Sequence, residues 1–250
     1  WNSSYSNVLE KNSFFKSNSL ALIVAIHQPN FMPWLGYFQK MKKADVFIML
    51  DNAQLPGKGL PNRNYIKGKD GKKVLLTVPI KKTNGVNSTY IEAIPDYSKL
   101  WQREHLNKIK DAYLKAPFFE AIFPQIESII LFKQDNLSNL STAFVATICN
   151  LLEIKTKLIL ASSMIEKGLQ KNDRNIDLCL QADATTYLSG QGAKKYNDEN
   201  LFLQHQLNII YQNFELPVYK QLGEVFMPNL SVIDILFNLP VDEIKKMIEA

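Results

Sequence analysis

The segment Ile23–Asp51 places the strongest constraint on how this chain can fold. Its first residues belong to an apolar run, Leu22–Ile26, that starts one residue earlier. This run is rich in β-branched residues and is typical of a buried strand. A polar turn and a helix-like stretch, Trp34–Lys43, follow, and a second apolar run, Val46–Leu50, ends on Asp51. The segment therefore predicts a strand–loop–helix–strand unit, the repeating unit of α/β proteins.

Strand-like runs and helical periods alternate along the rest of the chain. Five further runs predict strands, namely Lys73–Ile80, Thr89–Ile94, Lys157–Ala161, Thr186–Leu188 and Leu207–Tyr211. We therefore predict an α/β fold with a largely parallel central sheet flanked by helices, and with a helical insertion at about residues 98–152. The domain is expected to cover residues 22–250, after a tail or linker at residues 1–21.

Composition excludes several functional classes. No apolar run approaches the roughly 20 residues that a transmembrane helix needs, so we predict no membrane span. The net charge of +5 comes from scattered lysines without any nucleic-acid-binding motif, so we predict no nucleic-acid partner. Cys149 and Cys179 stand alone and are expected to be buried, reduced thiols. Since no His-x-x-x-His or Cys-x-x-Cys spacing occurs, we predict no metal site.

Polar side chains stand where the predicted strands end. His27 and Asn30 follow the first strand, Asp51 follows the second, and Ser189 ends a later one before a glycine. Ligands of open α/β sheets bind at this edge, so all four are candidate site residues. His27 could act as an acid or base near neutral pH, and the alternative is a structural cap of its turn. The turn loosely resembles that of nucleotidyltransferase-like enzymes, but it lacks their His-x-Gly-His.

A second polar cluster lies beside a glycine-containing loop, at Asn62, Arg63, Asn64 and Lys67. Arginine is scarce here, with only Arg63, Arg103 and Arg174 present, so each is more often kept for its bidentate geometry. Two amides, a guanidinium and an ammonium suit a nucleotide diphosphate or a carboxylate. The alternative is a solvated loop.

Two candidates lie inside predicted helices. His105 follows Trp101 by one turn and is either a proton acceptor or a residue at the boundary of the apolar face. Asp234 lies in an apolar helix, where a carboxylate needs a buried partner. Asp234 is therefore either part of a structural ion pair or a site residue.

Together these stretches resemble the WbqC-like family of bacterial proteins. The matching motifs run in order through residues 22–240: IHQPNFMPWLGYF (26–38), ADVFIMLDNAQ (44–54), NRNYIK (62–67), LTVPI (76–80), the Trp101 to Pro117 helix, YLSGQGAKKY (187–196), PVYKQ (217–221) and MPNLSVIDILFN (227–238). The loop before Asn62, Leu55–Pro61, departs from the basic or aromatic stretch expected of the family.

The resemblance implies a cytoplasmic enzyme of O-antigen or other surface-polysaccharide biosynthesis. The expected function is a transferase that joins an acyl or aminoacyl donor to a nucleotide-linked amino sugar, and the alternative is a non-catalytic protein that binds a sugar nucleotide or a partner enzyme. On the first reading, His27 or His105 is the base, and Arg63 and Lys67 hold the diphosphate. We expect the candidate residues to converge on one cleft: His27, Asn30, Asp51, Asn62, Arg63, Asn64, His105 and Ser189. The sequence identifies no cofactor and no oligomeric state.

Overall fold

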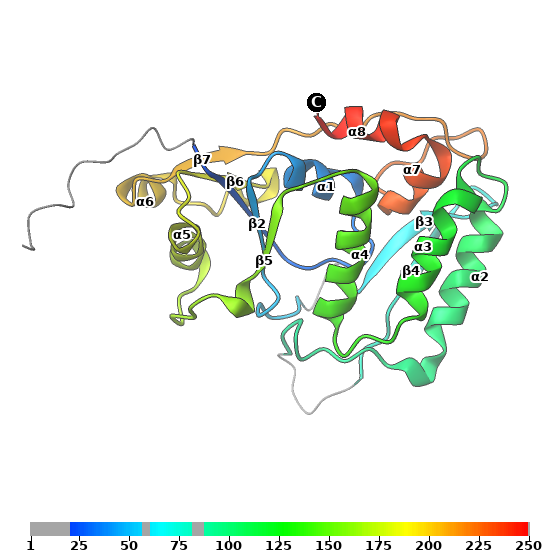
Figure 1. Cartoon of the computed structure of the whole chain (residues 1–250), viewed down its shortest axis with the longest axis horizontal. Helices are drawn as coiled ribbons and strands as arrows, with labels where there is room; N and C mark the ends of the chain where they lie inside the picture. The colour runs from blue at the N-terminus through cyan, green and yellow to red at the C-terminus, as the bar shows by residue number, and fades with distance from the viewer. Residues whose placement is uncertain (1–20, 57–60, 82–87, 250) are drawn as a thin grey trace, which may run out of the picture.

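The computed structural model describes residues 21–56, 61–81 and 88–249. Its centre is a sheet of five parallel strands in the order β5-β2-β1-β6-β7 (Figure 1). These strands are β1 (Ile23–His27), β2 (Val46–Met49), β5 (Lys157–Leu160), β6 (Thr186–Ser189) and β7 (Asn208–Tyr211). The predicted α/β class is confirmed, and the first two predicted strands are neighbours, with Val24 opposite Val46.

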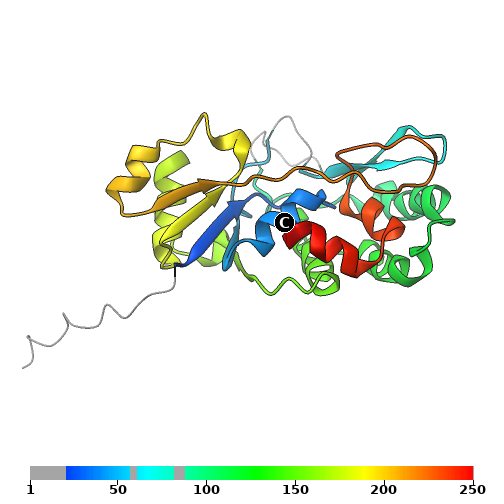
Figure 2. The same ribbon diagram turned by 90° about the horizontal axis from the view of Figure 1, so that it is seen from above.

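Side chains of the central strands are buried on both faces of the sheet. In β1, Val24 and Ile26 belong to one apolar cluster, whereas Ala25 between them belongs to another. Helices α1 (Leu35–Lys42), α4 (Leu137–Leu151) and α8 (Val241–Glu249) contribute to the larger cluster, and α5 (Lys171–Gln181) and α6 (Glu199–Gln204) to the smaller one (Figures 1 and 2). Burial on both faces explains why these strands are continuous apolar runs rather than alternating ones.

The strand order reverses in the middle of the sheet. From β1 the chain proceeds through β2 to β5 at one edge, whereas β6 lies on the other side of β1 and leads to β7. The connecting helices also change face, because α1 and α4 belong to one apolar cluster, and α5 and α6 to the other. The reversal point lies between β1 and β6, and such points are where doubly wound sheets bind their ligands.

The long connection from β2 to β5 forms a second layer of structure. It contains an antiparallel hairpin, β3 (Arg63–Lys67) with β4 (Lys73–Thr77), and the predicted helical insertion, α2 (Trp101–Tyr113), α3 (Phe119–Leu131) and α4. The chain returns to this layer after β7 with α7 (Val232–Asn238), which lies beside the hairpin and the insertion in both views (Figures 1 and 2).

The structure differs from the sequence expectations in two places. The polar cluster at residues 62–67 lies mostly on strand β3, a strand that was not predicted, because Tyr65 and Ile66 pair with the apolar strand β4. The strand expected at Thr89–Ile94 forms only an isolated bridge between Gln54 and Thr89. Its backbone turns instead, since Thr89 N and Oγ1 both donate to the Glu92 carboxylate at 2.9 Å.

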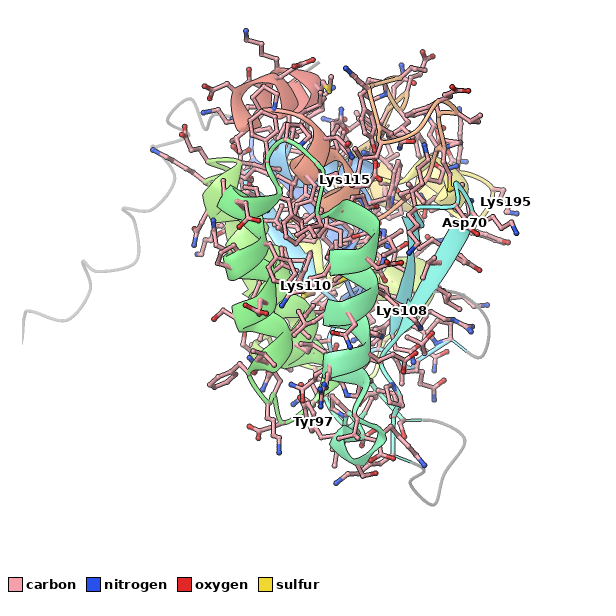
Figure 3. The ribbon with its side chains drawn as sticks, turned by 90° about the vertical axis from the view of Figure 1, so that its right-hand side faces the viewer. Asp70, Tyr97, Lys108, Lys110, Lys115 and Lys195 are labelled. Carbon is pink, nitrogen blue, oxygen red and sulfur yellow. The ribbon has the colours of Figure 1, made fainter. Side chains whose placement is uncertain are left out.

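The outer surface of the insertion has the charge pattern of a solvated face. Figure 3 shows Lys108 and Lys110 projecting from α2. Lys108 pairs with Glu104 at 2.6 Å, and Lys110 pairs with Glu127 of α3 at 3.0 Å. In the part of the chain that the structure describes, no helix is long and apolar enough to cross a membrane. Residues 1–20, and with them almost all of the expected tail, lie outside the described residues.

Candidate functional site

Three of the candidate residues meet at the carboxyl edge of the parallel sheet. His27 ends β1, Ser189 ends β6 beside it, and Asp51 follows β2 on the other side. The loops after β1 and β2 are joined directly, because Leu50 N donates to His27 O at 2.8 Å. The edge therefore places these three residues on three neighbouring strands around the reversal point.

The imidazole of His27 is held as a neutral proton acceptor. Its Nδ1 lies 3.0 Å from the Gln28 carbonyl oxygen, and since a carbonyl only accepts, Nδ1 carries the hydrogen and Nε2 keeps its lone pair. The ring also makes an edge contact with Tyr37, with 4.9 Å between centroids. Burial, helped by the positive charge of Lys40, lowers the pKa of His27 to about 4. His27 is therefore neutral at physiological pH, as a general base must be.

Asp51 fastens two strand ends together. Its carboxylate accepts from Ser162 N at 2.8 Å and from Ser162 Oγ at 2.5 Å, which ties the end of β2 to the turn after β5. The side chain of Asp51 is buried, and both of its oxygens have a partner. This engagement gives Asp51 a positioning role for the residue that follows it, Asn52.

Asn52 opens onto a pocket at the carboxyl ends of β2 and β5, where α5 begins. The pocket has a volume of about 630 Å³ and is lined by Asn52, Gln54, Glu166, Gly168, Leu169, Gln170 and Arg174. Arg174 Nη2 donates to Asn52 Oδ1 at 2.5 Å and lies 3.5 Å from Glu166 Oε2, while Asn52 Nδ2 donates to that same carboxylate oxygen at 3.0 Å. The three side chains form a closed triangle of hydrogen bonds and charge.

The β3–β4 hairpin is fastened to the loop between β1 and α1. Asn64 Nδ2 donates to Met32 O at 2.5 Å, and Phe31 N donates to Pro61 O at 3.0 Å. Asn62 Nδ2 donates to Val78 O at 2.8 Å, inside the hairpin layer. The amides of Asn62 and Asn64 thus bind the protein's own carbonyls, and the half-buried Arg63 lies between them at the start of β3.

Lys67 and His105 lie in the interior. Lys67 is 4% exposed, and its ammonium donates to Val225 O at 2.5 Å and to Gln221 Oε1 at 3.4 Å. His105 is 2% exposed and donates from Nε2 to Thr77 O at 3.1 Å. Its ring packs against Phe31, the residue after Asn30, at 5.9 Å between centroids. His105 therefore supports the loop after β1 from the interior, whereas the ammonium of Lys67 is bound to the segment after β7 and is not available to hold a phosphate.

Several residues at this edge escaped prediction from the sequence. Lys40 of α1 is 2% exposed and donates to Ile26 O of β1 at 2.9 Å. The signal for Lys40 was its position on the helix, three residues after Tyr37 and next to Met41, where an apolar residue is expected. The signal for Arg174 was the scarcity of arginine, which the interpretation of the sequence applied only to Arg63.

The cysteines offer no nucleophile here. Cys149 and Cys179 are free and buried, and burial raises the pKa of each thiol to about 12, which makes both poor nucleophiles. Within the described residues, no group of three or more His, Cys, Asp or Glu side chains could hold a metal ion. The edge offers amides, hydroxyls, the carboxylates of Asp51 and Glu166, a guanidinium, an ammonium and one imidazole.

Acid should destabilise the fold through two histidines. Burial lowers the pKa of both His27 and His105 to about 4, below the ordinary value of 6.5. As pH falls below 6.5 the unfolded chain takes up protons first, so the stability contribution present at neutral pH is lost on the way to pH 4. Lowering the pH from 7 to 5 should reduce the free energy of unfolding by about 2 kcal/mol for each histidine. Urea titrations at both pH values measure this loss.

The controls for this pH dependence are single substitutions. His27→Gln and His105→Gln should each remove about half of the loss of stability that the two histidines cause between pH 7 and pH 5. A loss as large as that of the wild type in either variant would contradict the assignment for that histidine.

Comparison with known proteins places most of the chain within one family. Residues 28–246 match the model of the WbqC-like protein family. A relative from Mycobacterium tuberculosis, the uncharacterized protein Rv1507c, is 34% identical over 219 residues, which is 86% of this chain and 93% of that protein. No solved structure matches the chain.

Proposed function

Because the chain belongs to the WbqC-like protein family, we propose that it is a cytoplasmic transferase that modifies a nucleotide-linked amino sugar in O-antigen or other surface-polysaccharide biosynthesis. The second substrate is an acyl or aminoacyl donor, and the attacking group is an amine or hydroxyl of the sugar. The observation that carries the proposal is the pocket of Asn52 and Arg174 at the carboxyl ends of β2 and β5.

The chemistry of this pocket suits a sugar. Apart from a glycine and a leucine, its lining consists of amide, carboxylate and guanidinium side chains, which are planar and offer at least two hydrogen-bonding atoms each. Neighbouring hydroxyls on a sugar ring present donors and acceptors at a spacing that such planar groups bind in pairs. A volume of about 630 Å³ lies within the range of roughly 300–1,000 Å³ typical of small-molecule sites.

The position of the pocket suits a nucleotide-linked ligand. It opens at β2 and β5, whereas the reversal point lies at β1 and β6. Strands in a sheet are about 4.8 Å apart, so the two places are separated by on the order of 10 Å along one edge. A single nucleotide sugar spans such a distance, with its sugar in the pocket and its phosphates near His27. Arg63 is the candidate from the hairpin layer for a further phosphate contact.

Binding tests the proposal directly. A thermal-shift screen of nucleotide sugars, with and without acyl or aminoacyl donors, should raise the melting temperature by a few degrees for the specific ligand. Arg174→Gln should weaken the binding of that ligand by about 10- to 100-fold, because a charged, bidentate donor is lost from the pocket. Arg103→Gln, the same change at an exposed arginine on α2, is the matched control.

Two outcomes would change the proposal. If no nucleotide sugar binds at millimolar concentration, the transferase has no substrate and recognition of a partner protein takes its place. If a nucleotide sugar binds but no donor is ever consumed with it, the chain is a sugar-nucleotide-binding protein rather than an enzyme.

A further inference from the structure

We propose that Lys40 and Gln39, neighbours on α1, form the floor of a phosphate subsite between the carboxyl ends of β1 and β6. The subsite deepens the proposed function, because it assigns a place to the diphosphate of the nucleotide-linked ligand. It also predicts that Lys40 takes up a proton from the solvent when the phosphate binds.

The first observation is that β1 and β6 stop pairing early. Paired with β2, strand β1 stays in register as far as His27 opposite Met49, whereas its pairing with β6 ends at Ala25 opposite Leu188. The next carbonyl of β1 on that side, Ile26 O, accepts from Lys40 Nζ at 2.9 Å. The ammonium therefore lies where the two strands part, at the reversal point of the sheet.

The second observation is that this buried ammonium has no counter-ion. Among the described residues, no carboxylate lies within ion-pair distance of Lys40. The titratable groups that act on it are His27 of β1 and Cys179 of α5, and neither is negatively charged at neutral pH. Burial lowers the pKa of Lys40 to about 7, which reflects the cost of an unpaired buried cation.

The third observation is an unpartnered amide beside it. Gln212 Nε2 donates to Gly36 O and to Gln39 Oε1, both at 2.7 Å, and this fixes which end of each amide is oxygen. Among the residues that the structure describes, the Nε2 of Gln39 then has no hydrogen-bond partner, although Gln39 is fully buried. A buried amide donor without an acceptor is rare and indicates a missing ligand or water.

The loop that follows β6 is open at two glycines. A Cβ built on Gly190 or on Gly192 would meet nothing within 4 Å, so the backbone after β6 faces open space. Ser189 and Gln212 at the same ends are joined by a hydrogen bond from Gln212 N to Ser189 O at 2.8 Å. A phosphate arriving there would accept from Lys40 and Gln39 and would supply the missing negative charge.

Proton uptake follows from the charge on the phosphate. In the free protein Lys40, with a pKa of about 7, is mostly neutral at pH 8 and mostly charged at pH 6. A bound phosphate favours the charged ammonium and raises its pKa. Binding at pH 8 should therefore add close to one proton at Lys40, and binding at pH 6 should add almost none.

The experiment uses inorganic pyrophosphate as the probe. Calorimetric titrations at pH 6 and pH 8, in buffers of different ionisation enthalpy, count the protons taken up by the wild type, Lys40→Met and Lys42→Met. At pH 8 the wild type should take up close to one proton more than Lys40→Met, and at pH 6 the two should agree. Lys40→Met should bind at least tenfold more weakly, whereas Lys42→Met, at a more exposed lysine of the same helix, should behave as the wild type.

A second variant keeps the test decisive if Lys40→Met does not fold. Lys40→Arg carries a permanent charge, so it should bind pyrophosphate without the extra proton at pH 8. Unchanged proton uptake in Lys40→Arg, equal pyrophosphate affinity in Lys40→Met, or no pyrophosphate binding to the wild type at millimolar concentration would each overturn the subsite.

The subsite and the proposed function can fail separately. If pyrophosphate binds as expected but no nucleotide sugar does, the subsite stands and the sugar-nucleotide function falls. If nucleotide sugars bind Lys40→Met as tightly as they bind the wild type, the function stands and the subsite falls.

Discussion

Replacing Asp234 by alanine is expected to lower the free energy of unfolding by about 3–5 kcal/mol, the largest loss of stability that we predict for one side chain. Asp234 lies on α7 and is fully buried. One carboxylate oxygen accepts from Tyr113 Oη at 2.7 Å, and the other accepts from Tyr219 Oη at 2.6 Å and from Gln221 Nε2 at 2.8 Å. Removing the carboxylate would leave the hydroxyls of Tyr113 and Tyr219 without their acceptor. Gln221 Nε2 would keep its bonds to Met227 O and Tyr219 Oη.

The network around Asp234 holds the second layer together. Tyr113 on α2 also accepts from Lys67 N of β3 at 3.0 Å, so one carboxylate connects α2, α7, the hairpin and the segment after β7. Burial raises the pKa of Asp234 in spite of its three hydrogen bonds, which indicates that the site is costly for a lone charge. The loss of stability should therefore be cooperative across these elements rather than local.

Urea unfolding curves measure this prediction. Asp242→Ala removes the carboxylate of an exposed aspartate on α8, paired with Lys245 at 3.0 Å, and should change the unfolding free energy by less than about 0.5 kcal/mol. A loss below about 1 kcal/mol for Asp234→Ala would mean that the network contributes little.

Asp234 also shows where reasoning from the sequence stops. An acid inside an apolar helix predicted a buried partner, and the sequence left open whether the partner was structural or part of a site. The hydrogen-bond partners of Asp234 are two tyrosines and a glutamine, so the carboxylate lies in a network of neutral groups rather than in the ion pair that one alternative expected. Tyr219 and Gln221 are near in sequence, but 121 residues separate Tyr113 from Asp234, and such a partner cannot be found from spacing.

The sequence predicted strands correctly where both faces of the strand are buried. The strands β1 and β2 were found because both of their faces are buried, which gives short continuous apolar runs. Strand β3 was missed because only its last two residues, Ile66 and Lys67, are buried, and one of these is a lysine. The order of the five strands in the sheet could not be predicted from the sequence, since parallel strands are joined by long connections.

The residues of the candidate site also fall into two groups, those that the sequence predicted and those that it did not. His27, Asp51 and Ser189 were predictable, because a polar residue at the end of a buried strand must lie at the sheet edge. Lys40 and Arg174 lie on helices and reach the edge only through tertiary packing. Their roles, like those of Asn30, Arg63 and the other candidate residues, stay proposals that the ligand experiments test.

The two histidines proposed as the base should separate in kinetics. On a confirmed substrate, His27→Gln should lower kcat by about 10²- to 10⁴-fold with binding largely retained, which is the usual range for loss of a general base. His27 ends β1 at the edge, and its Nε2 is left to accept a proton because Nδ1 is held by Gln28 O. His105→Gln should reduce stability more than turnover, because its Nε2 is already used by Thr77 O in the interior.

The pH profile tests this prediction further, through the difference between the acidic limbs of kcat and kcat/KM. Since kcat/KM reports the free enzyme, its acidic limb should follow the lowered pKa of His27, about 4, rather than the ordinary value of 6.5. The positive charge of Lys40 helps to lower the pKa of His27, and a phosphate bound at Lys40 would offset that charge. The acidic limb of the kcat profile, which reports the substrate complex, should therefore lie at higher pH than the acidic limb of the kcat/KM profile. If His27→Gln keeps full turnover, His27 is not the base. If His105→Gln loses turnover while remaining folded, the interior histidine is the base, and the edge of the sheet only positions the substrate.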